Sequence, residues 1–99
     1  MIDEAYREFN DPEMGDPVVD LQPKFPNVVV TRTFSKAFGL AGLRSGYCVA
    51  HPEVIVEINK TRLPFSVNNL AQVGMLAAIE HVDEAMVQVE TLILSLIHI

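Results

Sequence analysis

The sequence predicts an α/β domain, because segments typical of strands lead into segments typical of helices. The clearest strand is NVVVTRTF at residues 27–34, which is β-branched and hardly alternates between apolar and polar side chains at its start. That pattern is typical of a strand covered on both faces, as in a parallel sheet. The second half of the chain holds three segments whose ends carry the prolines and capping residues that bound helices.

The first half of the chain is expected to hold short strands separated by loops. Residues 1–6, MIDEAY, begin as a strand that runs into a loop. Residues 10–17 contain two prolines and a glycine, which predict a loop. Residues 18–26 have room for one short helical turn before the next proline. After the strand at residues 27–34, the next expected strand is SGYCVA at residues 45–50.

Three helices are expected after residue 50. In the first, Pro52 stands near the first helical position and Pro64 lies beyond the end. The second covers residues 66–81, and the third covers residues 83–94 with Asp83 as its cap. Candidate caps of the second helix are Ser66, Asn68 and Asn69, and the residues expected on one face are Leu70, Val73 and Ala77.

Composition limits the classes of function. The chain has 99 residues, of which 49% are hydrophobic and 20% charged, so it is globular rather than disordered. Its net charge of −6 argues against a nucleic-acid or anionic-membrane binder, since those need clustered Lys and Arg. Cys48 is the single cysteine, and the first residues lack the pattern of a signal peptide, so we expect a cytoplasmic location. Residues 92–99, LILSLIHI, are too few to span a bilayer, which takes about 20.

The stretch TRTFSKAFGLAGLRSGY, residues 31–47, carries the most chemical information. A lysine in apolar surroundings or near another cation has a lowered pKa and becomes a nucleophile toward a carbonyl, which is the role expected of Lys36. Arg44 stays protonated and suits a bidentate anion such as phosphate, and Thr33 and Ser35 offer hydroxyl groups to the same anion. Pyridoxal 5'-phosphate carries both a carbonyl and a phosphate. Such a cofactor needs an acid partner for its ring nitrogen, for which Asp3 is the candidate.

Other interpretations of these residues remain open. Taken alone, Arg44 would more often be an ordinary ion-pair partner, for example of Glu4 or Asp3, although its context favours phosphate. The glycine spacing fits neither a dinucleotide-binding nor a P-loop motif, and Ser35 directly before Lys36 is not the spacing of a Ser–Lys hydrolase. A non-enzymatic α/β module that binds an anion at Ser35 and Arg44 is the alternative from another class. No metal site is expected, because no ligand spacing relates Cys48 to the three histidines, His51, His81 and His98.

The segments DEAYREF and TRTFSKAFGLAGLRSGY together resemble the fold-type I, pyridoxal-phosphate-dependent aminotransferases, most of all the histidinol-phosphate aminotransferases. The resemblance runs from about residue 2 to about residue 90 and includes LPFSVNNLAQ at residues 63–72. It implies the large, cofactor-binding domain of that fold, a mostly parallel sheet flanked by helices. The roles that it implies are the pyridine nitrogen for Asp3, the ring hydroxyl for Tyr6, the cofactor carbonyl for Lys36, and the phosphate for Thr33, Ser35 and Arg44.

The same resemblance implies a transaminase that moves an amino group between histidinol phosphate and 2-oxoglutarate in histidine biosynthesis and works as a homodimer. An aromatic aminotransferase or a phosphothreonine-type decarboxylase of the same fold is an alternative, since these side chains contact the cofactor rather than the substrate. Family members are several times longer. We therefore expect residues 1–90 to be part of the large domain, residues 91–99 to be an atypical tail, and the 99-residue chain alone to be inactive.

Overall fold

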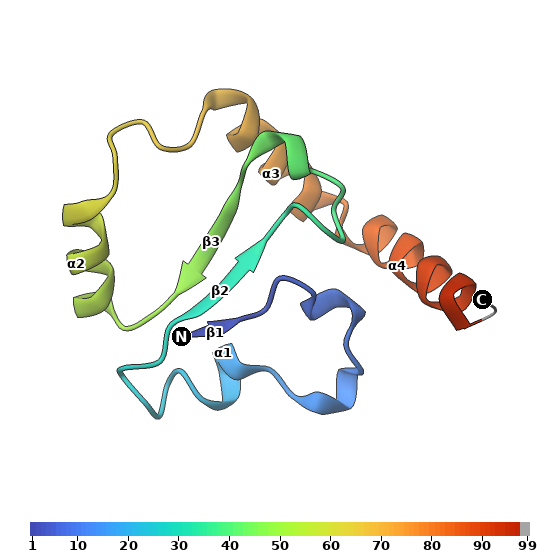
Figure 1. The fold of residues 1–99 in the computed structure, drawn as a ribbon, viewed down its shortest axis with the longest axis horizontal. Coiled ribbons are helices and arrows are strands. Elements are labelled where there is room, and N and C mark those ends of the chain that lie inside the picture. Colours follow the sequence, from blue (N-terminus) through green and yellow to red (C-terminus); the bar gives the residue numbers. More distant parts are fainter. Residues whose placement is uncertain (98–99) are drawn as a thin grey trace.

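The structure is a computed structural model that describes residues 1–97, and it confirms the α/β class (Figure 1). Its sheet has three strands in the order β1 (Ile2–Asp3), β2 (Val30–Thr33) and β3 (Gly46–Val49). The pair β1–β2 is parallel, with Asp3 opposite Thr31, whereas the pair β2–β3 is antiparallel. The described sheet is therefore mixed.

The antiparallel return of β3 follows from its connection to β2. Residues 34–45 contain a single 3-10 turn, η3 (Ala41–Leu43), and no crossover helix, so the chain turns back beside the strand that it leaves. Two residues of this connection have positive φ, Gly39 at 66° and Arg44 at 53°. Residue Phe34 donates its backbone N–H to the carbonyl of Ser45 at 3.2 Å, which closes the connection at its base.

Strand β2 is shorter than the expected strand at residues 27–34. The backbone N–H of Val28 donates to the carbonyl of Phe25 at 2.9 Å, so a turn occupies the residues just before the strand. The strand over residues 45–50 is confirmed as β3, and the short helical turn after the first loop is confirmed as α1 (Pro17–Asp20). The segment before α1 contains two 3-10 turns, η1 (Arg7–Phe9) and η2 (Pro12–Met14).

The three expected helices are present as α2 (Pro52–Thr61), α3 (Asn69–Glu80) and α4 (Val82–Ile97). Of the candidate caps of α3, Asn68 is the one that acts, because its Oδ1 accepts the backbone N–H of Ala71 at 2.8 Å. The expectation that Asp83 caps the third helix is wrong. Helix α4 begins one residue earlier, so Asp83 lies inside its first turn.

Helix α4 extends away from the sheet, while α2 lies on the far side of β3 (Figure 1). The helix continues across residue 91, where the atypical tail was expected to begin; the tail's last two residues, His98 and Ile99, lie outside the described part. In that part of the chain, no helix combines the length and the apolar character needed to cross a membrane.

The buried apolar side chains are spread over β2, the loop after it, α3, which packs on η3, and α4, which packs on η1 and α3. They are Val30, Phe34, Ala37, Ala71 and Val89. The expected apolar face of α3 is not the buried one, because Leu70 is 70% exposed and Val73 is 64% exposed. Helix α3 instead turns Ala71 and Gly74 inward. Gly74 contacts the η3 turn so closely that a Cβ there would lie 2.5 Å from Leu43 Cδ1.

We predict that Gly46→Ala destabilises the sheet, because a Cβ at this position would lie 2.7 Å from the backbone oxygen of Arg32 on the neighbouring strand. Backbone atoms of a paired strand cannot move aside as a flexible side chain can, so the expected loss is about 1–3 kcal/mol in the free energy of unfolding. Urea denaturation followed by circular dichroism measures it. The matched control is Gly42→Ala, where a Cβ meets nothing within 4 Å. Equal stability of the two variants would contradict the prediction.

Candidate active site

Five of the six predicted site residues line one pocket of about 360 Å³. The pocket lies where β1 and β2 end and the loop after β2 begins, and the carboxyl ends of neighbouring parallel strands are a usual place for a ligand. Its lining residues are Asp3, Ala5, Thr31, Arg32, Thr33, Ser35, Lys36 and Arg44. Residues that are about 30 to 40 positions apart in the sequence are thus brought to one place by the pairing of β1 with β2.

Asp3 is the last residue of β1 and has an exposed side chain. Its Oδ1 accepts the backbone N–H of Ala5 at 3.0 Å, which fixes the carboxylate at the strand end. Within residues 1–97 the other carboxylate oxygen has no hydrogen-bond partner, so Asp3 presents a negative charge to the pocket.

The hydroxyl groups are oriented by the end of β2. Thr33 Oγ1 donates to the carbonyl of Ser45 at 3.3 Å and accepts the backbone N–H of Ser35 at 3.1 Å. This pair of hydrogen bonds bends the chain immediately after the strand. As a result, Ser35 and Lys36 follow Thr33 along the wall of the pocket.

Lys36 and Tyr6 face each other from different segments. The Nζ of Lys36 lies 5.3 Å from the centroid of the Tyr6 ring, a cation–π distance. Tyr6 does not line the pocket itself, but this contact places it beside the pocket's lysine. The expectation that apolar neighbours enclose Lys36 is wrong: Phe34 and Phe38 pack on each other with ring centroids 5.2 Å apart, and Lys36 is exposed.

Arg44 reaches the same pocket from the far end of the connection. Its backbone is left-handed, with φ 53° and ψ 48°, and its Nη1 donates to the carbonyl of Ala41 at 2.9 Å. Within residues 1–97, no ion pair joins Arg44 to Glu4 or Asp3, so the alternative role of Arg44 as their partner is wrong. Its guanidinium keeps donors for an external anion.

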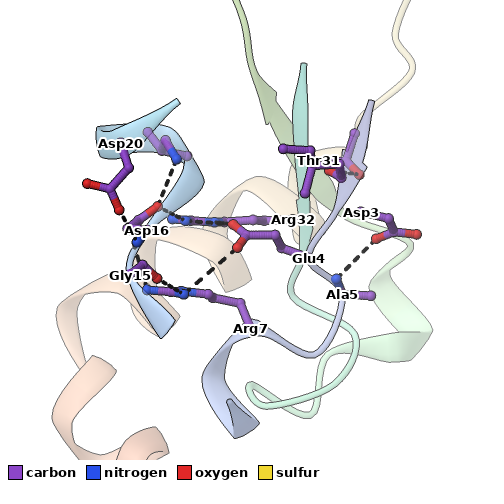
Figure 2. Close-up of polar contacts among 11 residues, drawn as sticks. Asp3, Glu4, Ala5, Arg7, Gly15, Asp16, Asp20, Thr31 and Arg32 are labelled. Atoms are coloured by element: carbon purple, nitrogen blue, oxygen red, sulfur yellow. Dashed lines mark hydrogen bonds and ion pairs between the residues drawn. The ribbon is translucent and has the colours of Figure 1, made fainter. Parts of the chain in front are cut away.

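The partner of Glu4 is Arg32, and this pair was not foreseen (Figure 2). Arg32 Nε donates to Glu4 Oε2 at 2.8 Å, and its Nη2 lies 2.7 Å from the same oxygen and 2.7 Å from Asp16 Oδ1. Arg7 completes the cluster, 3.9 Å from Glu4 and from Asp16, and also donates to the carbonyl of Gly15. A signal was available: an arginine between two threonines of a strand points to the face opposite theirs and needs a partner there.

The cluster shifts the pKa values of two of its members. Burial alone would raise the pKa of Asp16, but the N–H of Val18 and the charges of Arg32 and Arg7 together lower it. Burial alone would lower the pKa of Arg32, but hydrogen bonding to Glu4 and the charge of Asp16 raise it. Both groups are therefore held in their charged forms at neutral pH.

Two further features of the described residues bear on function. A second, larger pocket of about 710 Å³ lies between the aromatic side chains of Phe34, Phe38 and Tyr47 and the helices α3 and α4, and it is lined mainly by apolar groups. No group of three or more metal-binding side chains occurs in residues 1–97, and His98 lies outside them.

Comparison with known proteins identifies similar sequences over nearly the whole chain. The family model "Aminotransferase class I and II" matches residues 1–98. An aromatic amino acid aminotransferase of Streptomyces avermitilis is 48% identical over 94 residues, which are 94% of this chain and 26% of that protein. Histidinol-phosphate aminotransferase 2 of Ralstonia nicotianae is 46% identical over 83 residues, 84% of this chain and 22% of that protein. The chain thus spans about a quarter of the length of these curated relatives.

A solved structure agrees with this result. The histidinol-phosphate aminotransferase of Sinorhizobium meliloti, in complex with pyridoxal-5'-phosphate, matches with a TM-score of 0.70 and 36% identity. The match covers 86% of this chain and 24% of that one. The described α/β arrangement is therefore the one found in part of a larger aminotransferase.

We predict that Asp16→Asn lowers the free energy of unfolding near neutral pH by about 1 kcal/mol, since it removes a charged acceptor of Arg32. The pKa of Asp16 is below its ordinary value of 3.8, so its ionised form stabilises the fold above that pH, and the stabilisation is lost as pH falls through the folded-state pKa. The variant should therefore lose less stability in acid than the natural chain does.

Urea unfolding at a series of acidic pH values measures both effects. The control is Glu90→Gln, which removes an exposed carboxylate that makes no ion pair within residues 1–97. If Asp16→Asn and Glu90→Gln have the same pH dependence, the ionised Asp16 does not stabilise the fold.

Proposed function

Because the chain belongs to the class I and II aminotransferases, we propose that it carries the cofactor lysine of a pyridoxal 5'-phosphate-dependent transaminase. The observation that carries the proposal is the shared pocket, where a carboxylate, an amine, two hydroxyl groups and a guanidinium converge. These groups are complementary to the cofactor's ring nitrogen, carbonyl and phosphate. A relative of known structure holds this cofactor.

Each side chain is assigned to the part of the cofactor that its chemistry suits. Arg44 would hold the phosphate with its free donors, aided by the hydroxyl groups of Thr33 and Ser35. Asp3 would bind the protonated ring nitrogen, since its carboxylate faces the pocket with one unshared oxygen. Tyr6, next to Lys36, is assigned to the ring hydroxyl.

When bound, the cofactor supplies an electron sink for the carbon that carries the substrate's amino group. Asp3 would hold the ring nitrogen in its protonated form. Lys36 Nζ would face the cofactor carbonyl and would accept a proton from the substrate carbon. The nearby ring of Tyr6 restricts where Nζ moves.

For the substrate we propose histidinol phosphate, with 2-oxoglutarate as the acceptor, in histidine biosynthesis. Support comes from the Ralstonia relative and the Sinorhizobium structure, both named for that activity. An aromatic amino acid is the second candidate, favoured by the Streptomyces relative. The comparison of amino transfer from histidinol phosphate and from phenylalanine separates the two. A cytoplasmic homodimer is part of this proposal and rests on the family resemblance.

We predict that Lys36→Ala abolishes the adduct that borohydride traps between the chain and pyridoxal 5'-phosphate, because Lys36 Nζ is the amine in the pocket. The chain has two other lysines, Lys24 and Lys60, which provide the comparison. Lys60 already pairs with Glu57 at 2.6 Å on the surface, so Lys60→Ala should leave the adduct unchanged. Peptide mass spectrometry locates the adduct. Its persistence at another amine in Lys36→Ala would overturn the assignment and leave the anion-binding module as the better interpretation.

We predict that Arg44→Ala weakens cofactor binding by about tenfold or more, as expected for the loss of a charge-assisted hydrogen bond. Arg44→Lys should have a smaller effect, since it keeps the charge but not the two-pronged donor. Arg62→Ala is the control, because Arg62 is exposed and lies outside the pocket. Fluorescence titration with pyridoxal 5'-phosphate measures all three affinities. Equal affinities would show that Arg44 does not bind the phosphate.

A further inference from the structure

We propose that Glu4 and Arg32 are positioning residues that aim Asp3 at the ring nitrogen of the cofactor. The inference rests on the proposed function, which gives Asp3 that partner. It goes further in assigning a role to a pair of charged side chains that stand on the other side of the strand from the pocket carboxylate (Figure 2).

The geometry of β1 creates the need for such a pair. The strand has two residues, and the backbone hydrogen bonds at its two ends run from Ile2 N to Val29 O at 2.8 Å and from Glu4 N to Thr31 O at 2.9 Å. A strand this short is marginal by itself. Asp3, the last residue of the strand, therefore has little regular strand structure around it to fix its direction.

The ion pair supplies the missing restraint. Consecutive side chains of a strand point to opposite faces. The ion pair that holds Glu4 on one face therefore also fixes the backbone orientation that points Asp3 to the other face. Figure 2 shows the two carboxylates on opposite sides of β1. Glu4 is only 8% exposed, and Arg32 holds one of its oxygens through both Nε and Nη2. A buried, two-pronged pair of this kind resists rotation far better than an exposed one.

The guanidinium of Arg32 lies on the Glu4 side of the sheet, opposite Asp3, although Arg32 also borders the pocket. Its Nη2 is shared between Glu4 and Asp16, each at 2.7 Å. Within residues 1–97, the Asp3 carboxylate accepts the Ala5 N–H and makes no ion pair with Arg32.

The test uses the full chain and two ligands, pyridoxal 5'-phosphate and its 1-deaza analogue, which has a C–H group in place of the ring nitrogen. Only the first ligand can bind Asp3 through that position. For the natural chain we expect pyridoxal 5'-phosphate to bind about tenfold more tightly than the analogue, because a charge-assisted hydrogen bond contributes about that much affinity. Asp3→Asn should bind the two ligands with nearly equal affinity.

In Glu4→Gln, the proposal expects the preference for pyridoxal 5'-phosphate to fall to about twofold or less, while affinity for the analogue stays within about twofold of the natural chain. Adding Glu4→Gln to Asp3→Asn should change nothing further, since Glu4 acts through Asp3. If Glu4→Gln does not fold, the second variant is Arg32→Lys, which keeps the positive charge but lacks the two donor nitrogens of the guanidinium. Glu57→Gln is the control, because it breaks the exposed pair with Lys60 and should keep the full preference.

The outcomes separate the two hypotheses. A natural chain that binds both ligands equally overturns the assignment of Asp3 and, with it, this inference. A natural chain that prefers pyridoxal 5'-phosphate, with Glu4→Gln and Arg32→Lys keeping that preference, overturns the positioning role alone. Equal weakening of both ligands in these variants also overturns it, because it would show a general structural role.

Discussion

The pairing of Arg32 with Glu4 is the interaction on which the rest of the arrangement depends. Strand β1 has only two residues, and it carries the acidic side chain of the candidate site. One guanidinium joins Glu4, directly after β1, to β2 and also pairs with Asp16 at the start of α1. Without it, the acid and the lysine would belong to two loosely connected parts of the chain.

The sheet therefore separates charged side chains that pair with one another from charged side chains that line the pocket. On one side, charges neutralise each other at hydrogen-bond distance and remain ionised at neutral pH. On the other, Asp3, Lys36 and Arg44 line an open pocket with few internal partners, so their charges remain available to a ligand. The paired charges thus lie apart from the charged side chains that line the candidate site.

Local signals in the sequence were enough for most of the elements, because turns, caps and strand runs are properties of neighbouring residues. Pro52 and Asn68 mark helix starts, and the β-branched run around Val30 marks the central strand. Features that depend on contacts between residues far apart in the sequence were not predicted. The Glu4–Arg32 pair joins residues 28 positions apart. The buried face of α3 was also missed, because it is set by the η3 turn that Gly74 contacts and not by its own pattern.

The left-handed backbone of Arg44 has a consequence for how this sequence can change. A non-glycine residue in that conformation costs roughly 1–2 kcal/mol, and glycine would remove the cost. A search for more stable variants would thus favour glycine at this position and, in doing so, discard the guanidinium that reaches the pocket. Backbone stability and the presence of a guanidinium at the pocket are therefore opposed at this single residue.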